Sequence, residues 1–347
     1  MNLTERIEIF SKFSDFILEN TVKKDNENSN NILLNAITEA SLKNPWFSED
    51  NIKQALISIA NSTTNEKINR WVKKYQNIES KSPPVKVGIV MAGNIPLVGF
   101  MDFFYVIMSG NKALIKLSSD DNILIPALIE VLKNINPKIT HFIEIIKDKL
   151  SGFEAVIATG SNNTSRYFEY YFGKYPNIIR KNRNSIAVLN GNETFEQLSE
   201  LSNDITDYYG LGCRNVSKIF VPVSYNFDLL TKALKQKNNI LDFHKYRNNY
   251  DYQKSILIIN RTPFIDCESV LLTRNLSLSS PIAVVYYDFY DKIDEIINYT
   301  KNNANEIQCI VSNFLNTENV VPFGKTQSPE LADYADNVDV MNFLLNL

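Results

Sequence analysis

Short β-branched runs alternate with segments of helical length from residue 85 onward, and this alternation restricts the fold more than any other feature. The pattern predicts strands at 85–91, 112–116 and 153–158, and helices at 98–109, 123–134 and 164–172. Strands that alternate with helices of this length build a parallel sheet with right-handed crossovers. The expected fold class is therefore α/β.

A second block of the same kind begins near residue 185. It has expected strands at 185–189, 218–221, 255–259, 282–287 and 308–311, and expected helices at 195–206 and 228–234. Ahead of the first block, apolar residues at helical spacing, such as Phe10 and Phe13, predict N-terminal helices, and the polar stretch 23–31 predicts a loop. We therefore expect residues 1–184 and 185–320 to form two domains, followed by a C-terminal segment, 321–347.

Composition excludes several classes of protein. The 36 Lys and Arg residues against 39 Asp and Glu leave a net charge of -3, so no basic excess is present for binding nucleic acid. No apolar run approaches the ~20 residues that span a bilayer. Three widely spaced cysteines and two histidines predict neither a disulfide framework nor a metal site. We expect a protein of a reducing compartment, the cytoplasm.

Cys213 is the first candidate for chemistry. Gly210 and Gly212 precede it, and Arg214 and Lys218 follow it. Glycines let the backbone approach a ligand closely, and nearby cations favour the thiolate, which is the nucleophilic form of cysteine. The segment suits acyl transfer through a thioester. The alternative is a small buried apolar residue, the commonest role of a free cysteine.

Two strand–helix junctions of the first block carry further polar groups. Asn94 follows the first strand, where its amide could hold an oxyanion or cap the next helix. Lys116, Ser118 and Ser119 follow the second strand. Ligands of open α/β sheets bind beyond the carboxyl ends of the strands, although serines here could also cap a helix.

A third junction follows the strand at 153–158 and contains Gly160 and Ser161. A helix N-terminus has free N–H groups, so it could bind a nucleotide phosphate. The alternative is a well-capped helix with no ligand, because the segment matches neither of the common glycine-rich phosphate motifs.

These segments, in this order, resemble the aldehyde dehydrogenase superfamily, and within it most closely the acyl-CoA reductases related to the LuxC fatty-acid reductases. Residues 93–96 resemble the oxyanion segment with its Asn-x-Pro, 116–119 the Lys-Pro-Ser-Glu cofactor segment, 159–161 the Thr-Gly-Ser turn and 212–213 the catalytic cysteine. Later likenesses are Ser280-Pro281, 321–329 and 333–339, so the resemblance runs from about Val85 to the end of the chain.

The resemblance implies an aldehyde dehydrogenase-like fold. Residues 1–184 would hold the N-terminal helices and a Rossmann-like NAD(P)-binding domain, 185–320 the catalytic domain, and 321–347 would pack back near the active site. It implies that Cys213 is the nucleophile and Asn94 the oxyanion donor. It implies that the cofactor is bound by Lys116, Ser118, Ser119, Gly160 and Ser161. It also implies a homo-oligomer, by analogy a dimer.

The sequence departs from the superfamily in two places. Members that oxidise aldehydes carry a glutamate base in a Glu-Leu-Gly-Gly-Lys segment, whereas the aligned residues 179–183 are Ile-Arg-Lys-Asn-Arg. Without that base an acyl-cysteine lasts long enough to receive hydride. Ser119 replaces the ribose-binding glutamate, and Lys116 would attract a 2′-phosphate, so we expect NADPH in preference to NADH.

The expected reaction is therefore NADPH-dependent reduction of an acyl-CoA to an aldehyde through an acyl-cysteine. Three alternatives remain open at this point. One is reduction of an acyl phosphate, as in gamma-glutamyl phosphate reductase, and another is the reverse reaction of a CoA-acylating aldehyde dehydrogenase. The third is a non-catalytic protein that binds a nucleotide or CoA.

Overall fold

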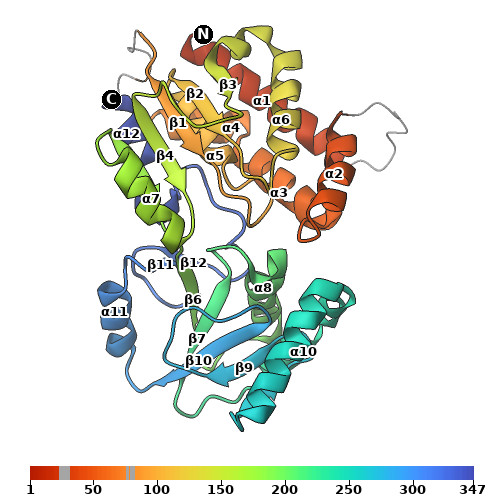
Figure 1. Cartoon of the computed structure of the whole chain (residues 1–347). Helices are drawn as coiled ribbons and strands as arrows, with labels where there is room; N and C mark the ends of the chain where they lie inside the picture. The colour runs from red at the N-terminus through yellow and green to blue at the C-terminus, as the bar shows by residue number, and fades with distance from the viewer. Residues whose placement is uncertain (23–31, 76–77, 79–82) are drawn as a thin grey trace. The chain divides into compact units, whose positions relative to one another are not determined.

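The computed structural model describes residues 1–22, 32–75, 78 and 83–347, and it divides into two compact units. Unit 1 comprises Met1–Asn182 and Ser328–Leu347, and unit 2 comprises Arg183–Gln327. Both are built from parallel strands and helices (Figure 1), which confirms the expected α/β fold class. The predicted loop at 23–31 lies outside the described residues.

Unit 1 contains a parallel five-stranded sheet in the order β3-β2-β1-β4-β5. Its strands are β1 (Lys86–Val90), β2 (Lys112–Lys116), β3 (Ile143–Ile145), β4 (Ala155–Thr159) and β5 (Asn177–Arg180). The strand order reverses between β1 and β4, so right-handed crossovers place the helices after β1 and β2 on one face and the helix after β4 on the other.

Helices surround this sheet and supply much of its core. They are α1 (Leu3–Val22), α2 (Ile32–Lys43), α3 (Glu49–Ser62), α4 (Asn65–Val72), α5 (Phe100–Met108), α6 (Leu124–Ile135), α7 (Asn162–Phe172) and α12 (Val340–Leu345), with 3₁₀ turns η1 (Pro137–Phe142) and η4 (Ala335–Asn337). The Phe10 ring of α1 meets that of Phe104 on α5 with centroids 4.7 Å apart, and Phe13 stacks on Phe100 at 5.4 Å. The predicted N-terminal helices are therefore confirmed, and they anchor α5.

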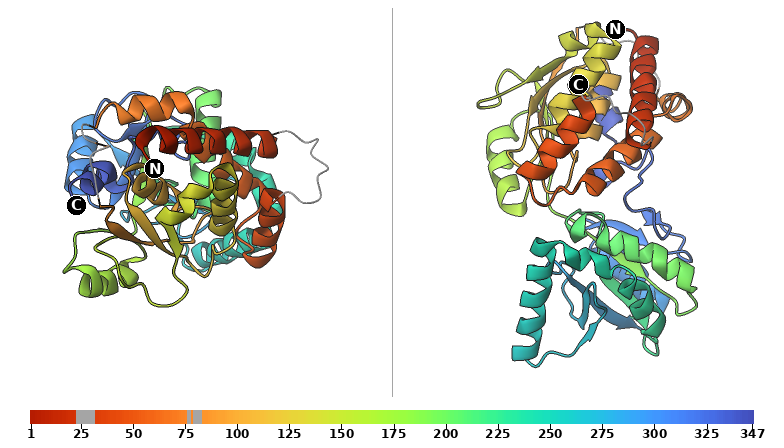
Figure 2. Two further views of the ribbon diagram at one scale, coloured as in Figure 1. Left: turned by 90° about the horizontal axis from the view of Figure 1, so that it is seen from above. Right: turned by 90° about the vertical axis from the view of Figure 1, so that its right-hand side faces the viewer.

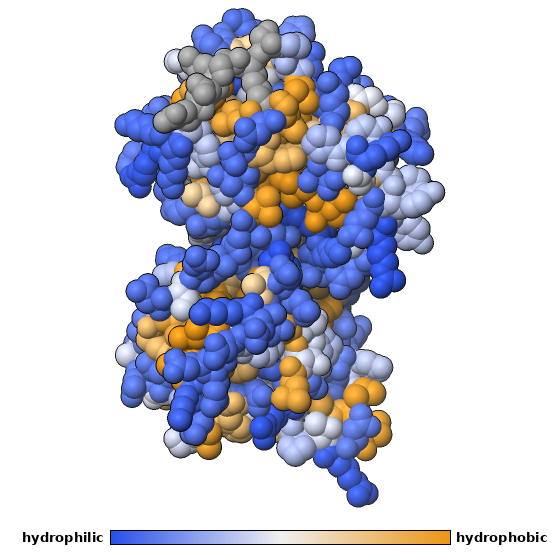
Figure 3. Space-filling model, turned by 90° about the vertical axis from the view of Figure 1, so that its left-hand side faces the viewer, coloured by the Kyte–Doolittle hydropathy of each residue, from blue (hydrophilic) through white to orange (hydrophobic). Residues whose placement is uncertain are grey.

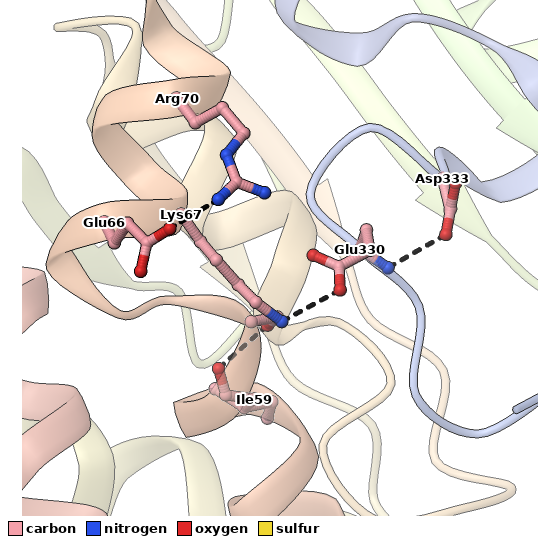
Figure 4. A network of polar contacts seen from close by, with 7 residues as sticks. Ile59, Glu66, Lys67, Arg70, Glu330 and Asp333 are labelled. Carbon is pink, nitrogen blue, oxygen red and sulfur yellow. Dashed lines mark hydrogen bonds and ion pairs between the residues drawn. The ribbon is translucent and has the colours of Figure 1, made fainter.

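The last twenty residues return to unit 1 and pack against α4 and α5. The indole N–H of Trp71 donates to the hydroxyl of Tyr334 at 2.9 Å. Lys67 forms an ion pair with Glu330 at 2.8 Å on the exposed side of the same contact (Figure 4). Exposed pairs of this kind contribute at most about 1 kcal/mol, so the buried aromatic contact carries most of the attachment.

Unit 2 contains a seven-stranded sheet in the order β12-β11-β6-β7-β10-β9-β8, parallel except for the β8–β9 pair. Its strands are β6 (Asn184–Val188), β7 (Val216–Pro222), β8 (Phe264–Asp266), β9 (Leu271–Arg274), β10 (Val284–Tyr290), β11 (Ile307–Val311) and β12 (Val320–Val321). Its helices are α8 (Phe195–Thr206), α9 (Asp228–Lys235), α10 (His244–Ile259) and α11 (Ile293–Asn302), with 3₁₀ turns η2 (Asp207–Gly210) and η3 (Asn238–Asp242). Residues 321–327 belong to this unit, whereas we expected the C-terminal segment to begin at 321. The domain boundaries and the roles assigned to the two domains stay predictions.

The strand expected at 255–259 is wrong, because these residues form the last turns of α10. This helix lies at the outer edge of unit 2 (Figure 2) and buries Tyr246 and Tyr250, four residues apart. Ile258 and Ile259 are 58% and 74% exposed. The four-residue apolar run at 256–259 resembles a buried strand in composition, and only the helical spacing upstream distinguishes the two.

The face of the molecule that Figure 3 shows is mostly polar. On the face seen in Figure 3, hydrophobic residues form separate patches among hydrophilic ones. Among the helices of the described segments, none is both long enough and apolar enough to cross a membrane.

Candidate active site

The residues predicted to bind the cofactor lie at one edge of the unit 1 sheet. Strands β2, β1 and β4 are adjacent and parallel, so the segments that follow them meet at their carboxyl ends. These segments contain Asn94 after β1, Lys116, Ser118 and Ser119 at and after the end of β2, and Gly160 and Ser161 after β4. The reversal of strand order between β1 and β4 is where open α/β sheets bind ligands.

Asn94 lies in an irregular turn between β1 and α5, and its side chain is exposed. Helix α5 begins at Phe100 with Gly99 as its N-cap, so the alternative interpretation of Asn94 as a helix cap is wrong. Farther along the turn, Leu97 has a left-handed backbone with φ of 62°, and its N–H donates to Asp121 at 2.8 Å. The turn is thus tied to the loop that follows β2.

Gly93 is required because that loop packs directly onto it. A Cβ atom at Gly93 would lie 2.6 Å from the hydroxyl oxygen of Ser118 and 3.0 Å from the Cβ of Asp120. The same hydroxyl accepts a hydrogen bond from the Asp120 N–H at 3.2 Å. The turn that contains Asn94 and the loop that contains Ser118 are therefore in van der Waals contact.

Lys116 is half-buried, and its ammonium donates a hydrogen bond to the carbonyl oxygen of Lys147, in the segment after β3. Ser119 is exposed beyond it. Neither serine caps α6, whose N-cap is Ile123, although the Leu124 N–H at the start of that helix faces the Asp121 carboxylate.

Ser161 is the N-cap of α7, where its hydroxyl accepts a hydrogen bond from the Thr164 N–H at 3.2 Å. A Cβ atom at Gly160 would lie 2.9 Å from the Phe168 ring and 3.1 Å from the Thr164 side chain. The capped-helix interpretation is therefore confirmed. A role in binding phosphate stays a prediction, and the missing Cβ lets the Phe168 and Thr164 side chains pack closely against this junction.

Arg180 ends β5, in the stretch that aligns with the missing glutamate. Its guanidinium forms two hydrogen bonds with the Asp102 carboxylate of α5, at 2.5 and 2.9 Å, and both side chains are buried. Burial lowers the pKa of Arg180, but the attraction of Asp102 outweighs it, so the pKa lies above its ordinary value. The guanidinium is a cation and the carboxylate is paired with it, so neither group is available as a base. The sequence shows Arg180, but its partner is 78 residues away and has no local signal.

Cys213 lies in unit 2, in a tight turn between η2 and β7, and it is half-buried. Asn215 closes this turn in both directions: its N–H donates to the carbonyl of Gly212, and its side-chain oxygen accepts from the Gly212 N–H, both at 2.9 Å. The amide nitrogen of Asn215 donates to the carbonyls of Asp204 and Asp207 at 3.1 and 2.9 Å. The backbone around Cys213 is thus held rigidly. An asparagine two residues after the candidate cysteine was the only sequence signal for this.

Asp204 also links the Cys213 turn to the segment that contains Gly324 and Thr326. Its carboxylate accepts hydrogen bonds from the Gly324 N–H at 2.7 Å and from the N–H and hydroxyl of Thr326 at 3.1 and 2.8 Å. The Thr326 carbonyl accepts in turn from the Nε of Arg214. Burial raises the pKa of Asp204 to about 6, although these hydrogen bonds oppose the rise. Sequence reasoning missed Asp204.

Ser185 contacts the backbone of Cys213 through its hydroxyl. Its hydroxyl donates to the Cys213 carbonyl at 2.9 Å and lies 3.0 Å from the Cys309 sulfur. A hydroxyl has a single proton, so Cys309 is the donor in the second contact. Lys218 is 1% exposed and donates to the carbonyls of residues 275–276 at 3.0 and 2.8 Å. Its ammonium thus supports that loop.

Comparison with solved structures identifies the fold. Aldehyde dehydrogenase 21 from Physcomitrella patens has a TM-score of 0.69 at 11% identity, covering 100% of this chain and 84% of that one. KauB, an aldehyde dehydrogenase from Pseudomonas aeruginosa, has a TM-score of 0.65 at 13% identity, covering 92% and 73%. The indole-3-acetaldehyde dehydrogenase AldA from P. syringae, solved with NAD+ and IAA, has 0.64 at 12%, covering 92% and 74%. The fold is that of an aldehyde dehydrogenase.

A protein-family model described as acyl-CoA reductase (LuxC) matches residues 8–255. The chain therefore belongs to the acyl-CoA reductase (LuxC) family, which confirms the resemblance seen in its motifs. No curated protein matches the chain. Family and fold together make it an oxidoreductase that acts on aldehyde or acyl groups.

Proposed function

We propose that the protein reduces an acyl-CoA to an aldehyde with NADPH, through an acyl-cysteine on Cys213. The observation that carries this proposal is the Cys213 turn, which Asn215 closes from both sides in a chain of the acyl-CoA reductase family. A fixed backbone around a half-buried thiol suits a nucleophile, because its N–H groups keep one direction while charge develops on the substrate.

In this mechanism the Cys213 thiolate attacks the thioester carbonyl and CoA leaves as its thiolate, so that the acyl group is bound to sulfur. The amide of Asn94 and the N–H of Cys213 stabilise the oxyanion of the tetrahedral intermediate. A nicotinamide cofactor held by Lys116, Ser118, Ser119, Gly160 and Ser161 would supply the hydride that the thioester carbon receives. Cys213 then leaves as thiolate, and the aldehyde is released.

The absence of a base favours reduction over hydrolysis. Residues 179–183 contain no carboxylate, and Arg180 and Asp102 neutralise each other in a buried pair. Neither this stretch nor the buried pair therefore supplies a base that could deprotonate water, which favours an acyl-cysteine that persists until hydride or a thiol reaches it.

The cofactor proposal rests on the carboxyl edge of the unit 1 sheet. AldA, which shares the fold, was solved with NAD+, which supports a nicotinamide cofactor here. The N-terminus of α7, which Ser161 caps, fits a phosphate through its free N–H groups. Ser119 and Lys116 favour NADPH, because the first lacks a charge that would repel a 2′-phosphate and the second attracts it. Ser119→Glu should shift the preference toward NADH, measured as the ratio of kcat/KM values.

Intact-protein mass spectrometry tests the nucleophile. A panel of acyl-CoAs mixed with the protein without NADPH should give an acyl adduct on Cys213, and NADPH should remove it with release of aldehyde. Cys213→Ala should form neither. Cys267→Ala is the matched control, because that thiol is fully buried and burial raises its pKa to about 12.

The other outcomes separate the rival functions. Aldehyde formation by Cys213→Ala would refute the mechanism. An adduct formed only from acyl phosphates would assign the protein to the acyl phosphate reductases, and fast acyl-CoA synthesis from aldehyde, NAD(P)+ and CoA would assign it to the acylating dehydrogenases. Cofactor binding without any adduct would leave a nucleotide-binding protein. A homodimer stays a prediction, which light scattering can test.

A further inference from the structure

Asp121 is a buried acid that the proposed mechanism does not use. It follows β2 in the loop that carries Ser118 and Ser119, and it is 5% exposed. One carboxylate oxygen accepts the Leu97 N–H at 2.8 Å. The other oxygen is buried and forms no hydrogen bond within the described part of the chain, although the Leu124 N–H at the start of α6 faces the carboxylate. Burying a carboxylate with so few hydrogen-bond partners costs free energy. We therefore asked what the hydrogen bond with Leu97 contributes to the structure.

Leu97 explains what the carboxylate does. This side chain is 3% exposed, and its φ of 62° is one that residues with a Cβ rarely adopt. The left-handed residue reverses the chain after Asn94 and Pro96, so that it can enter α5 through the hydrogen bond from the Phe100 N–H to the Leu97 carbonyl at 3.0 Å. A charged acceptor on the Leu97 N–H stabilises this unfavourable conformation.

The same contact joins two parts of the candidate site. Asn94 lies three residues before Leu97, and Ser119 two residues before Asp121. Gly93 already packs on Ser118, with room for no Cβ between them. The hydrogen bond between Asp121 and Leu97 therefore adds a directional interaction to the van der Waals contact between Gly93 and Ser118.

We propose that Asp121 is a positioning residue for the reaction, which fixes Leu97 and through it the direction of the Asn94 amide. This inference rests on the proposed role of Asn94 as oxyanion donor. It predicts that Asp121 acts on the acylation of Cys213, a step that needs no NADPH.

The test is a double-mutant cycle on the rate of Cys213 acylation, measured by mass spectrometry without cofactor. Asp121→Ala should slow acylation by at least about tenfold, because it removes a charged hydrogen-bond acceptor. Asp121→Asn keeps an oxygen acceptor and should stay within about threefold of the wild type. Asp120→Ala is the matched control: it removes the neighbouring exposed carboxylate and should leave the rate unchanged.

The decisive measurement repeats Asp121→Ala in an Asn94→Ala background. If Asp121 acts by positioning the amide, the second substitution causes little further loss, since no amide remains to be positioned. An equal loss in both backgrounds would overturn the proposal and leave Asp121 with a purely structural role. Should Asp121→Ala fail to fold, Asp121→Ser gives the same comparison, because its shorter side chain withdraws the acceptor. Failure of the proposed function looks different: the wild-type protein itself would form no adduct.

Discussion

Replacing Asp102 with Ala should strongly destabilise unit 1. The side chains of Arg180 and Asp102 are 7% and 8% exposed, and two hydrogen bonds join them. Removing one member of a buried pair leaves the other charge without compensation and typically costs about 3–5 kcal/mol. The Nε of Arg180 is buried without a hydrogen bond in the described structure, so the guanidinium already lacks one partner. Asp336 attracts it from farther away and should recover only part of the loss.

Removing both charges should cost far less than removing one. In Asp102→Leu with Arg180→Met, side chains of similar size replace the pair, and no buried charge is left. Such replacements are often neutral or stabilising, by up to about 4 kcal/mol, because the cost of desolvating two charges disappears together with their attraction. The double variant should therefore be more stable than Asp102→Ala.

Tryptophan fluorescence during urea unfolding measures this directly. Trp46 and Trp71 are the two tryptophans of the chain, and both lie in unit 1, so the signal reports on that unit. Glu169→Ala is the control, since it breaks an exposed pair with Lys181 and should cost at most about 1 kcal/mol. A loss below about 1 kcal/mol for Asp102→Ala, or a double variant no more stable than the single one, would refute the reasoning.

Three further predictions follow from individual contacts. Asn94→Ala should slow Cys213 acylation by about 10²–10³-fold at unchanged thermal stability, because the side chain is exposed; an unchanged rate would exclude it as oxyanion donor. Gly93→Ala should lower the free energy of unfolding by about 1–3 kcal/mol and raise the KM for NADPH, as its Cβ displaces Ser118; calorimetry and initial rates check both. Burial raises the pKa of Asp204 from 3.8 to about 6, so protonation favours the folded state. About 3 kcal/mol of stability, complete below pH ~4, should be lost as the pH rises through 6, and circular dichroism during unfolding of Asp204→Asn should show a flatter pH dependence.

Elements with a strong local pattern were predictable from the sequence. The strand at 112–116 and the helix at 195–206 have the predicted bounds, because a short buried apolar run and a helical period are both visible in neighbouring residues. The carboxyl-edge position of Asn94, Lys116 and Gly160 also followed, since adjacency of parallel strands brings their ends together. Short strands such as β5, with four residues, were missed because they contain too few positions to show a period.

The contacts that hold the site could not be predicted in this way. Thr326 is 122 residues from Asp204, and Leu97 is 24 residues from Asp121. Each contact joins loops whose approach depends on how sheets and helices pack, and an acid in a loop looks the same whether it is buried or exposed. The strand expected at 255–259 fails for a different reason: a short apolar run has the composition of a buried strand, and the helical spacing that distinguishes the two lies upstream, in the rest of α10.

The ion pair of Arg180 and Asp102 connects stability with the direction of the chemistry. A carboxylate at the end of β5 could deprotonate water and turn an acyl-cysteine into free acid. In this chain the residue aligned with that carboxylate is Ile179, and its neighbour Arg180 is paired with Asp102 in the interior. A carboxylate in place of Arg180 would leave two buried like charges unless a neutral residue also replaced Asp102. A single Arg180→Glu substitution should therefore unfold unit 1. Neither member of the ion pair can thus be turned into a base by one substitution while the fold is kept.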